Sequence, residues 1–340
     1  MTSVFLDEIR SQPEVLARRL EAGWAEVEEV AGRLRRARPA ALVLAARGSS
    51  DHAATYAKYL FEIRNRLPVA LAAPSAFTLY ASPPRLDGLA VLAISQSGAS
   101  PDVSAVVEEA RRQGRPAFAL VNEPRSRLGR AAEVVMPMGA GRELSVPASK
   151  TYTASLLGLA MLSWALDPEP GFRAAIEAVP CAVSAALESG AGRLAGLVEG
   201  RRLAVIGRGY HLATAQEVAL KVTETSYLLA EARSVADFMH GPIAAVDSEL
   251  PVLLLEAAGP ALADMRRLGR RLDAQGAGVL RIGDRLSPGP RAVRVKTGLP
   301  ESLTPIPFAV AGQLFAQALA ARRGLDPDRP RGLRKVTETT

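Results

Sequence analysis

The sequence repeats itself at a nearly constant offset. Three landmarks carry the repeat: Arg47-Gly48 recurs as Arg208-Gly209, Gly98 recurs as Gly259, and Gln113-Gly114 recurs as Gln275-Gly276. The first two landmarks share one offset, and the third differs from it by a single position. Landmarks that keep nearly one spacing over so much of a chain predict two copies of one domain.

Each copy alternates short, β-rich apolar runs with segments that carry apolar residues every three or four positions. This alternation predicts strands separated by helices, and therefore a parallel sheet with helices on both faces. The expected strands are 41–46, 68–72, 89–95, 116–121 and 133–137 in the first copy, and 202–207, 231–235, 251–256, 277–282 and 291–295 in the second. We therefore predict an α/β protein with two tandem doubly wound parallel-sheet domains of the flavodoxin-like type.

The repeat also suggests where the domains begin and end. We expect a leading helix within residues 1–38, at about 13–37, and then a first domain over 39–168. The second domain is expected over 169–325, followed by a C-terminal tail over 326–340. Helices at about 150–166 and 172–199 should join the two copies.

A cluster of hydroxyl groups follows one strand of the first copy. The apolar run LAIS at 92–95 leads directly into QSGASP at 96–101, where Ser and then Pro are typical of a helix start. Open α/β sheets bind ligands beyond the carboxyl ends of their strands, and a helix N-terminus offers free N–H groups to an anion. The second copy has Glu-Ala-Ala at the aligned positions 256–258. The pattern predicts a phosphate site in the first copy only, although capping serines in an ordinary turn explain this fragment equally well on its own.

Charge and composition narrow the class of protein. The net charge is +7, but the basic clusters at 33–38 and 266–272 alternate with apolar residues at helical spacing. We interpret them as solvated helix faces and expect no nucleic-acid partner, while a positive field would suit an anionic substrate. No apolar run is long enough to span a membrane, and the N-terminal stretch lacks the pattern of a signal peptide. We therefore expect a cytoplasmic protein with no membrane partner.

The residues that commonly bind metals or form disulfides are scarce. The chain has one cysteine, Cys181, and three histidines, none of them at a metal-ligand spacing. No internal disulfide can form, and we expect neither a metal nor another cofactor.

Six segments of the sequence occur in the order and spacing seen in one known family. They are RGSSDHA, ISQSGAS, SVPASKTYTA, GRGYHLATAQEVALKVTETSY, ADFMHGPIA and PRGLRKVTET. Over about residues 5–340 the chain resembles the double-domain sugar isomerase (SIS) family. Within it, the chain is similar to the isomerase domain of glucosamine-6-phosphate synthase and to the isomerising glucosamine-6-phosphate deaminases. The glutaminase domain of the synthase is expected to be absent, because the sequence begins Met-Thr-Ser.

The resemblance implies roles for individual residues. The residues that it implies for binding the phosphate and the sugar are Ser49, Ser50, Ser95, Gln96, Ser97, Ser100, Val146 and Ala148. Glu224 would move a proton between C1 and C2 of the sugar, and Lys221, on the same helix face, would hold the substrate and tune that carboxylate. His240 would open the sugar ring, and Lys335 in the tail would close the site and present an amine to the open-chain carbonyl. Without the resemblance, the sequence favours ordinary roles for three of them: a helix-surface carboxylate for Glu224, a loop histidine for His240 and a solvated tail residue for Lys335.

The resemblance implies aldose–ketose conversion of an amino-sugar 6-phosphate. We favour the release of ammonia from glucosamine 6-phosphate to give fructose 6-phosphate. Ammonia-dependent synthesis, phosphosugar isomerisation and deglycation of fructosamine 6-phosphate are alternatives, and a sugar-phosphate sensor is the alternative that is not an enzyme. The resemblance further implies a two-fold homodimer in which His240 enters the active site of the neighbouring subunit.

Overall fold

The computed structural model describes residues 3–247 and 249–335, so residues 336–340 of the expected tail lie outside the described part. The chain forms two compact units. The first unit, which contains the first copy of the repeat, consists of Glu14–Glu143, Lys150–Glu177 and the described residues 334–335. The second unit consists of the residues up to Pro13, Leu144–Ser149 and Ala178–Leu333.

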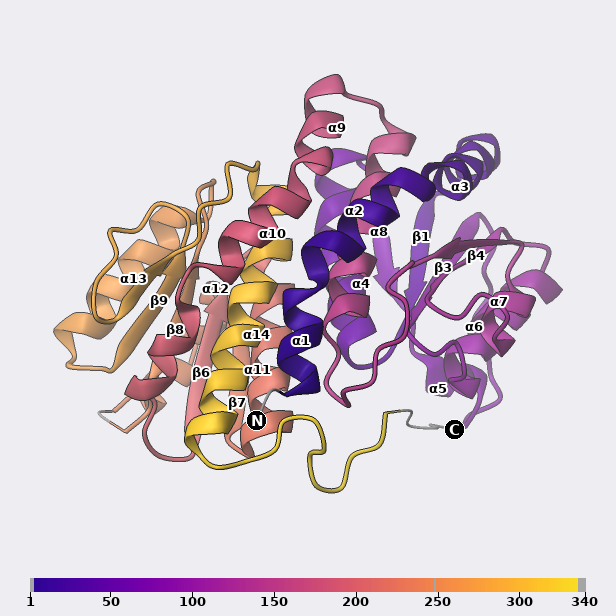
Figure 1. Ribbon diagram of the computed structural model, residues 1–340. Coiled ribbons are helices and arrows are strands. Elements are labelled where there is room, and N and C mark those ends of the chain that lie inside the picture. Colours follow the sequence, from indigo (N-terminus) through magenta and orange to yellow (C-terminus); the bar gives the residue numbers. More distant parts are fainter. Residues whose placement is uncertain (1–2, 248, 336–340) are drawn as a thin grey trace. The chain divides into compact units, whose positions relative to one another are not determined.

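Each unit contains one five-stranded sheet in which all the paired strands are parallel (Figure 1). The first sheet has the order β2-β1-β3-β4-β5, and the second has the order β7-β6-β8-β9-β10. The strands of the first sheet are β1 (Ala41–Ala45), β2 (Val69–Leu71), β3 (Leu89–Ser95), β4 (Ala117–Val121) and β5 (Val134–Pro137). Those of the second are β6 (Arg202–Gly207), β7 (Leu229–Ser234), β8 (Val252–Glu256), β9 (Val279–Gly283) and β10 (Ala292–Arg294). The two orders are the same when the strands of each copy are counted from its own start, which confirms the predicted duplication.

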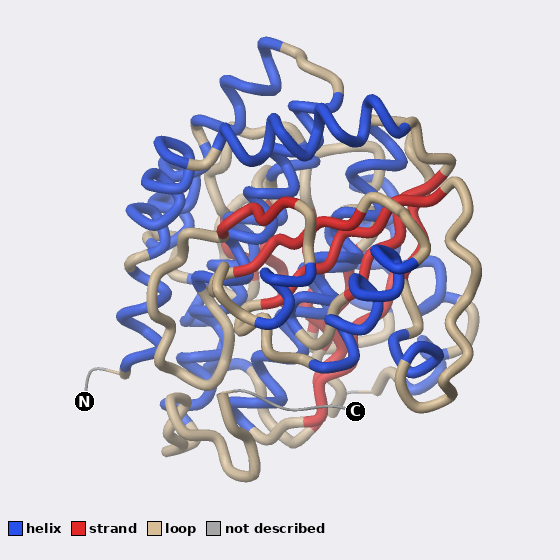
Figure 2. Tube along the Cα trace, turned by 90° about the vertical axis from the view of Figure 1, so that its right-hand side faces the viewer, coloured by secondary structure: helices blue, strands red, loops and turns tan. Residues whose placement is uncertain are grey.

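Helices alternate with the strands along the chain (Figure 2). The first unit contains all or most of α2 (Gln12–Ala22), α3 (Trp24–Ala37), α4 (Ser49–Arg64), α5 (Pro74–Phe77), α6 (Pro101–Arg112), α7 (Arg127–Ala131), α8 (Lys150–Leu166) and α9 (Pro170–Glu177). The second contains α1 (Val4–Arg10), α10 (Val179–Leu187), η1 (Ala191–Leu197), α11 (His211–Ser226), α12 (Val235–Met239), η2 (Pro242–Ala245), α13 (Leu262–Ala274), η3 (Glu301–Leu303) and α14 (Pro305–Arg322). Helices α8 and α14 are apolar around almost their whole circumference, as expected for helices buried inside a domain.

The two copies share their backbone geometry at two of the three landmark glycine pairs, Gly48/Gly209 and Gly114/Gly276, but Gly98 has a positive φ that Gly259 lacks. Gly48 after β1 has φ +56°, and Gly209 after β6 has φ +57°. Strand β3 ends at Ser95 and strand β8 ends at Glu256, and these two ends keep the offset that separates Gly48 from Gly209. The sequence alignment of the copies is therefore also their structural alignment.

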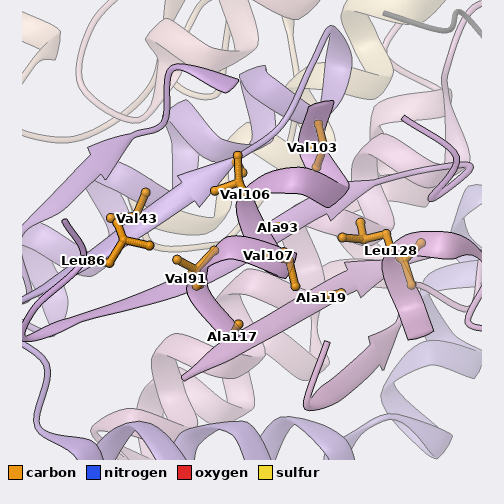
Figure 3. Close-up of a cluster of buried hydrophobic side chains, with 13 residues drawn as sticks. Val43, Leu86, Val91, Ala93, Val103, Val106, Val107, Ala117, Ala119 and Leu128 are labelled. Carbon is orange, nitrogen blue, oxygen red and sulfur yellow. The ribbon is translucent and has the colours of Figure 1, made fainter. Parts of the chain in front are cut away.

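The core of the first unit follows from the pattern of α6. Its residues Val103, Val106, Val107 and Ala110 repeat at helical spacing and pack on the buried side chains of the sheet (Figure 3). Helix α13 packs in the same way in the second unit, through Met265, Leu268 and Leu272. Strands buried on both faces have nearly continuous apolar sequences, which is why their positions could be predicted so closely.

Two helical predictions were wrong in detail. The expected leading helix at 13–37 is interrupted at Gly23, and a separate helix, α1, precedes it. A Cβ atom at Gly23 would overlap with the guanidinium of Arg19, so this close approach requires glycine. The expected helix at 172–199 is three shorter ones, because Pro180 lies in the first turn of α10 and Gly190, with φ +72°, precedes η1. Among the described residues, no helix is long and apolar enough to cross a membrane.

Candidate active site

The hydroxyl-rich segments of the first unit follow its two central strands. Strands β1 and β3 are neighbours, and the chain then continues to β2 on one side of the pair and to β4 on the other. Ser49 and Ser50 begin α4 just after β1, and Ser95 ends β3. This is the point where the strand order reverses, and open α/β sheets bind ligands there.

The loop after β3 is folded tightly around its own hydroxyl groups. The Oγ of Ser95 accepts a hydrogen bond from the Gly98 N–H at 3.0 Å, and the Oγ of Ser97 accepts one from the Ala99 N–H at 3.2 Å. Gly98 has φ +60°, and a Cβ atom there would overlap with the side chain of Ser126. Glycine is therefore required both by the backbone conformation and by the space available.

Ser100 is at the N-cap of α6, as predicted, but its side chain accepts no capping hydrogen bond. Its carbonyl oxygen instead accepts hydrogen bonds from the N–H and the Oγ of Ser104, at 3.1 and 3.0 Å. The side chains of Gln96, Ser97 and Ser100 are partly exposed. The helix N-terminus therefore keeps N–H groups that no N-cap side chain occupies, which is the arrangement that suits an anion.

An arginine and an aspartate connect the two hydroxyl-rich segments. The Nε of Arg47, directly before Gly48, lies 2.7 Å from the Oδ2 of Asp102 in the first turn of α6. The side chain of Asp102 is only 1% exposed, whereas that of Arg47 is 47% exposed. Burial raises the pKa of the neighbouring Asp51 carboxyl, although His52 and Arg47 oppose this shift. No local sequence pattern indicated that Arg47 and Asp102 form a pair.

The second unit contains a buried amine between two carboxylates on α11. The Nζ of Lys221 lies 2.6 Å from Glu224 Oε2 and 3.5 Å from Glu217 Oε1. The three residues share one helix face because they are spaced by four and three positions. The side chains of Lys221 and Glu217 are each 1% exposed, but that of Glu224 is 20% exposed. Glu224 is therefore the carboxylate of this trio that a ligand can reach.

His240 lies just after α12 and is exposed. Its Nδ1 is 2.7 Å from the carbonyl oxygen of Ala236, and because a carbonyl can only accept, Nδ1 carries the proton in this hydrogen bond. In the neutral ring, the lone pair is then on Nε2. This tautomer gives the imidazole a nitrogen that can accept a proton from a ligand.

Lys335 is held by a buried carboxylate. Its Nζ lies 2.8 Å from Glu143 Oε2, within the first unit. Glu143 also accepts hydrogen bonds from the N–H and the Oγ1 of Thr151 in the first turn of α8, at 3.1 and 2.8 Å. The only sequence signal for Glu143 was a single acid just before SVPASK, and a lone acid of this kind does not by itself predict a site residue.

Val146 and Ala148 lie on a segment that Glu8 of α1 holds in place. The carboxylate of Glu8 accepts hydrogen bonds from the N–H groups of Leu144, at 2.5 Å, and Ser145, at 3.3 Å. The side chains of Val146 and Ala148 are partly exposed. Because Glu8 lies so far from this segment along the chain, nothing in the local sequence indicated the connection.

The structure thus brings several of the predicted residues together, each with others on the same loop or helix or with one contacting side chain. Lys221 and Glu224 are in direct contact, the serines form one loop after β3 and one helix start after β1, and Lys335 contacts Glu143. Within residues 3–247 and 249–335, no group of histidine, cysteine or carboxylate side chains is arranged to hold a metal ion.

Comparison with known proteins identifies the family. The family model described as the SIS domain matches residues 34–164 and 196–286, which is more than half of the chain. The chain belongs to the SIS domain family. Each matched segment covers most of one copy of the repeat, so the duplication is a duplication of SIS domains.

Among curated proteins, the chain is similar to glutamine–fructose-6-phosphate aminotransferases (isomerizing). It is 30% identical to that of Zymomonas mobilis, over 96% of this chain and 57% of the relative. It is 34% identical to that of Thermus thermophilus, over 85% of this chain and 50% of the relative. The chain therefore spans about half the length of the curated relatives that it matches.

Solved structures of SIS proteins have the same fold. A Silicibacter pomeroyi protein, provisionally described as a phosphosugar isomerase, is 35% identical, with a TM-score of 0.88, and the match covers 96% of this chain and 100% of that one. The C-terminal domain of glucosamine-fructose-6-phosphate aminotransferase from Francisella tularensis is 23% identical, with a TM-score of 0.87, over 97% of this chain and 99% of that one. Because the Francisella tularensis domain is only 23% identical, its similarity to this chain supports the fold alone.

Proposed function

We propose that this SIS protein is an isomerising glucosamine-6-phosphate deaminase, which converts glucosamine 6-phosphate and water into fructose 6-phosphate and ammonia. The observation that carries the proposal is the trio on α11. Lys221 is buried between two carboxylates, and only Glu224 presents its carboxylate to a ligand. Aldose–ketose conversion requires a carboxylate of this kind, positioned to move a proton between two carbons.

In the proposed reaction, Glu224 removes the proton from C2 of the open-chain amino sugar, and the electron pair forms a double bond between C1 and C2. The π bond of the C1 carbonyl breaks at the same time, and its oxygen takes a proton from solvent. The same carboxylate then returns the proton to C1, which leaves an imine at C2. Water adds to C2, and ammonia leaves. The amine of Lys221, 2.6 Å from Glu224, holds this carboxylate in position between the two transfers.

The phosphate would be bound by the loop after β3 and by the start of α4. The proposed ligands are Ser49, Ser50, Ser95, Gln96, Ser97 and Ser100, with Val146 and Ala148 beside the sugar. Backbone N–H groups at two helix starts and several hydroxyl groups are suitable donors to phosphate oxygens. Binding a group far from the reacting carbons supplies positioning without participating in the chemistry.

His240 and Lys335 would act at the start of the reaction. His240 would open the pyranose ring. Its Nε2 would accept the C1 hydroxyl proton as the C1 carbonyl forms and the C1–O5 bond breaks, and it would pass this proton to O5, while Nδ1 stays hydrogen-bonded to Ala236. Lys335 would lie beside the open-chain carbonyl, with Glu143 holding its amine in place. No cofactor takes part in this proposal.

The names of the relatives support a sugar phosphate as the substrate, but they do not indicate whether ammonia is released or incorporated. The curated relatives are named for fructose 6-phosphate, and the Silicibacter pomeroyi structure for phosphosugars. The second of these descriptions also favours simple phosphosugar isomerisation, which would use the same base without loss of ammonia.

A coupled assay distinguishes these reactions. Purified protein is incubated with glucosamine 6-phosphate, and fructose 6-phosphate and ammonia are measured together. Equal amounts of both products support the deaminase. Turnover of glucose 6-phosphate without ammonia release would instead identify a phosphosugar isomerase, and synthesis only from fructose 6-phosphate with ammonium would identify the reverse activity. Binding of sugar phosphates without any turnover would contradict an enzymatic role.

The proposed homodimer can be tested by mixing inactive variants. If His240 serves the neighbouring subunit, Glu224→Gln and His240→Ala homodimers should each be nearly inactive. After random subunit exchange, half of the dimers are mixed, and each of these contains one intact site of two. Activity should then recover to about a quarter of the wild-type value. No recovery after verified subunit exchange would mean that one chain supplies the complete site.

A further inference from the structure

A cavity of about 770 Å³ in the second unit lies apart from the residues proposed for catalysis. Its lining comes from three segments that follow consecutive strands of the sheet: Ala258 after β8, Asp284–Ser287 after β9, and Lys296–Leu299 after β10, together with the last residue of β10. The cavity is therefore at the carboxyl edge of a parallel sheet, where open α/β folds bind ligands. Its volume is typical of a site for a small molecule.

The charges around this cavity are predominantly positive. Arg285, Arg294 and Lys296 line it, and Asp284 is the one carboxylate in the lining. Across the described residues, none of the three cations forms an ion pair with a carboxylate. Like charges that converge on one cavity repel each other, and an anion between them would relieve this repulsion.

The single carboxylate is already occupied by the protein backbone. The Oδ1 of Asp284 accepts a hydrogen bond from the Ala258 N–H at 2.9 Å. The Nε of Arg294 donates to the carbonyl oxygen of Asp284 at 3.1 Å, which orients the guanidinium and leaves its other N–H groups for a ligand. The hydroxyl groups of Ser287 and Thr297 line the same cavity and add further donors.

A second cavity in the same unit has a similar volume but lacks the excess of positive charge that an anion site needs. It measures about 780 Å³ and lies at the amino ends of the strands, beside residues such as Pro251 and Gly278. Its three arginines share the lining with Glu199 and Glu249, and Arg202 lies 3.5 Å from Asp247. Its charges are therefore largely compensated within the protein.

We propose that the cavity lined by Arg285, Arg294 and Lys296 is a second anion-binding site, which takes a small phosphorylated metabolite with at least two negative charges. Three cations against one backbone-bonded carboxylate match a diphosphate or bisphosphate better than a single monoanion. The site is distinct from the hydroxyl loop of the first unit, and the proposal does not depend on the reaction proposed above.

Calorimetric titration of the full chain with inorganic pyrophosphate at low ionic strength tests this site. Wild-type protein should bind pyrophosphate, and Arg294→Gln/Lys296→Gln should raise the Kd at least tenfold. Arg285→Gln/Lys296→Gln should have a similar effect, and it keeps the hydrogen bond of Arg294 in case the first variant is poorly folded. Arg10→Gln/Arg270→Gln removes the same charge from exposed helix positions outside the cavity and should leave the Kd within about twofold.

Ser97→Ala tests whether the measured pyrophosphate binds at the hydroxyl loop of the first unit instead of at this cavity. If it binds at the cavity, Ser97→Ala should leave the pyrophosphate Kd unchanged. Loss of binding in Ser97→Ala, with normal binding in both cavity variants, would overturn the proposal. So would equal Kd values in the wild type and both cavity variants, or no binding by the wild type at millimolar pyrophosphate.

Discussion

Helices α4 and α11 occupy the same place in the two copies but carry different chemistry. With Gly48 aligned on Gly209, all three residues of the acid–amine–acid trio have apolar or aromatic counterparts. The pairs are Glu217 and Tyr56, Lys221 and Leu60, and Glu224 and Ile63. One copy uses this helix for packing, and the other uses it to hold a buried amine between carboxylates.

At the loops after the third strand of each copy, the first copy is the one that has the candidate binding groups. These are its hydroxyl groups, which the second copy lacks. Where the first copy has Ser95, the second has Glu256, which is 3% exposed and lies 3.2 Å from Arg281. A Cβ atom at Gly259 would overlap with the carboxylate of Glu301, so this acid fills the space beside the loop. Burial raises the pKa values of Glu256 and Glu301. A phosphate held as proposed at Ser95 would meet the carboxylates of Glu256 and Glu301 here, so we expect no equivalent of that phosphate site in the second copy. The anion cavity proposed above depends instead on Arg285, Arg294 and Lys296, from β10 and the segments after β9 and β10.

The largest expected effect tests the difference between α4 and α11. Glu224→Gln keeps the shape of the side chain and removes the base, so kcat should fall by about 10²–10⁴-fold. Exchange of the C2 proton with solvent should stop as well. The matched control, Ile63→Gln, changes an exposed residue at the aligned position and should leave kcat within about twofold. Equal decreases in kcat in the two variants would contradict the proposal that α11, and not α4, carries the catalytic base.

A second test concerns an ion pair that both copies retain. Arg47–Asp102 in the first copy corresponds to Arg208–Asp264 in the second, with N–O distances of 2.7 and 3.3 Å. Asp102 is almost fully buried, so Asp102→Ala should lower the free energy of unfolding by about 2–3 kcal/mol. Asp264→Ala should cost less than about 1 kcal/mol, because Asp264 is more exposed. Urea denaturation measures the free energy of unfolding of both variants. Equal losses in the two variants would show that the burial of the aspartate does not set the stability contribution of the ion pair.

The third test uses His211, which stands in the second copy where the first has Ser50. Burial lowers the pKa of His211 to about 3, and its Nε2 is 2.8 Å from the hydroxyl of Thr304. Below pH 6.5 the unfolded chain binds a proton at this residue that the native state does not bind. The free energy of unfolding should therefore fall by about 2 kcal/mol from pH 7 to pH 5 through this residue.

His211→Gln isolates that contribution, because other groups titrate equally in both proteins. The difference in unfolding free energy between wild type and His211→Gln should narrow as the pH falls from 7 to 5. A difference that does not change with pH would mean that His211 is protonated in the native state.

The smallest effect concerns the hydroxyl loops. Ser97→Ala removes one donor to the proposed phosphate and should raise KM for the phosphorylated sugar about tenfold, with little change in kcat. The aligned change in the second copy, Ala258→Ser, should leave KM within about twofold. Initial-rate kinetics of both variants provide the comparison, and an unchanged KM in Ser97→Ala would remove the phosphate from this loop.

Much of the architecture could be predicted from the sequence because its signals are local. Parallel strands are buried on both faces and appear as apolar runs, and the repeated strand–helix alternation indicates a parallel sheet. The order of the strands within each sheet came only from the structure. Edge strand β7 was expected at 231–235 but runs from Leu229 to Ser234, because its alternately exposed residues weaken the signal. The break at Gly23 depends on the position of the Arg19 side chain, which no local pattern reveals.

For the candidate site, the sequence by itself determined which residue types are present and that Lys221 and Glu224 share a helix face, since a spacing of three positions brings side chains together on any α-helix. Only the tertiary structure decided which distant side chains meet. Glu143 reaches Lys335 across 192 residues of sequence, and Arg47 reaches Asp102 across 55. Such pairs depend on how strands and helices pack, because the energy that orders them comes from burial and from contacts across the whole domain, and not from neighbours along the chain.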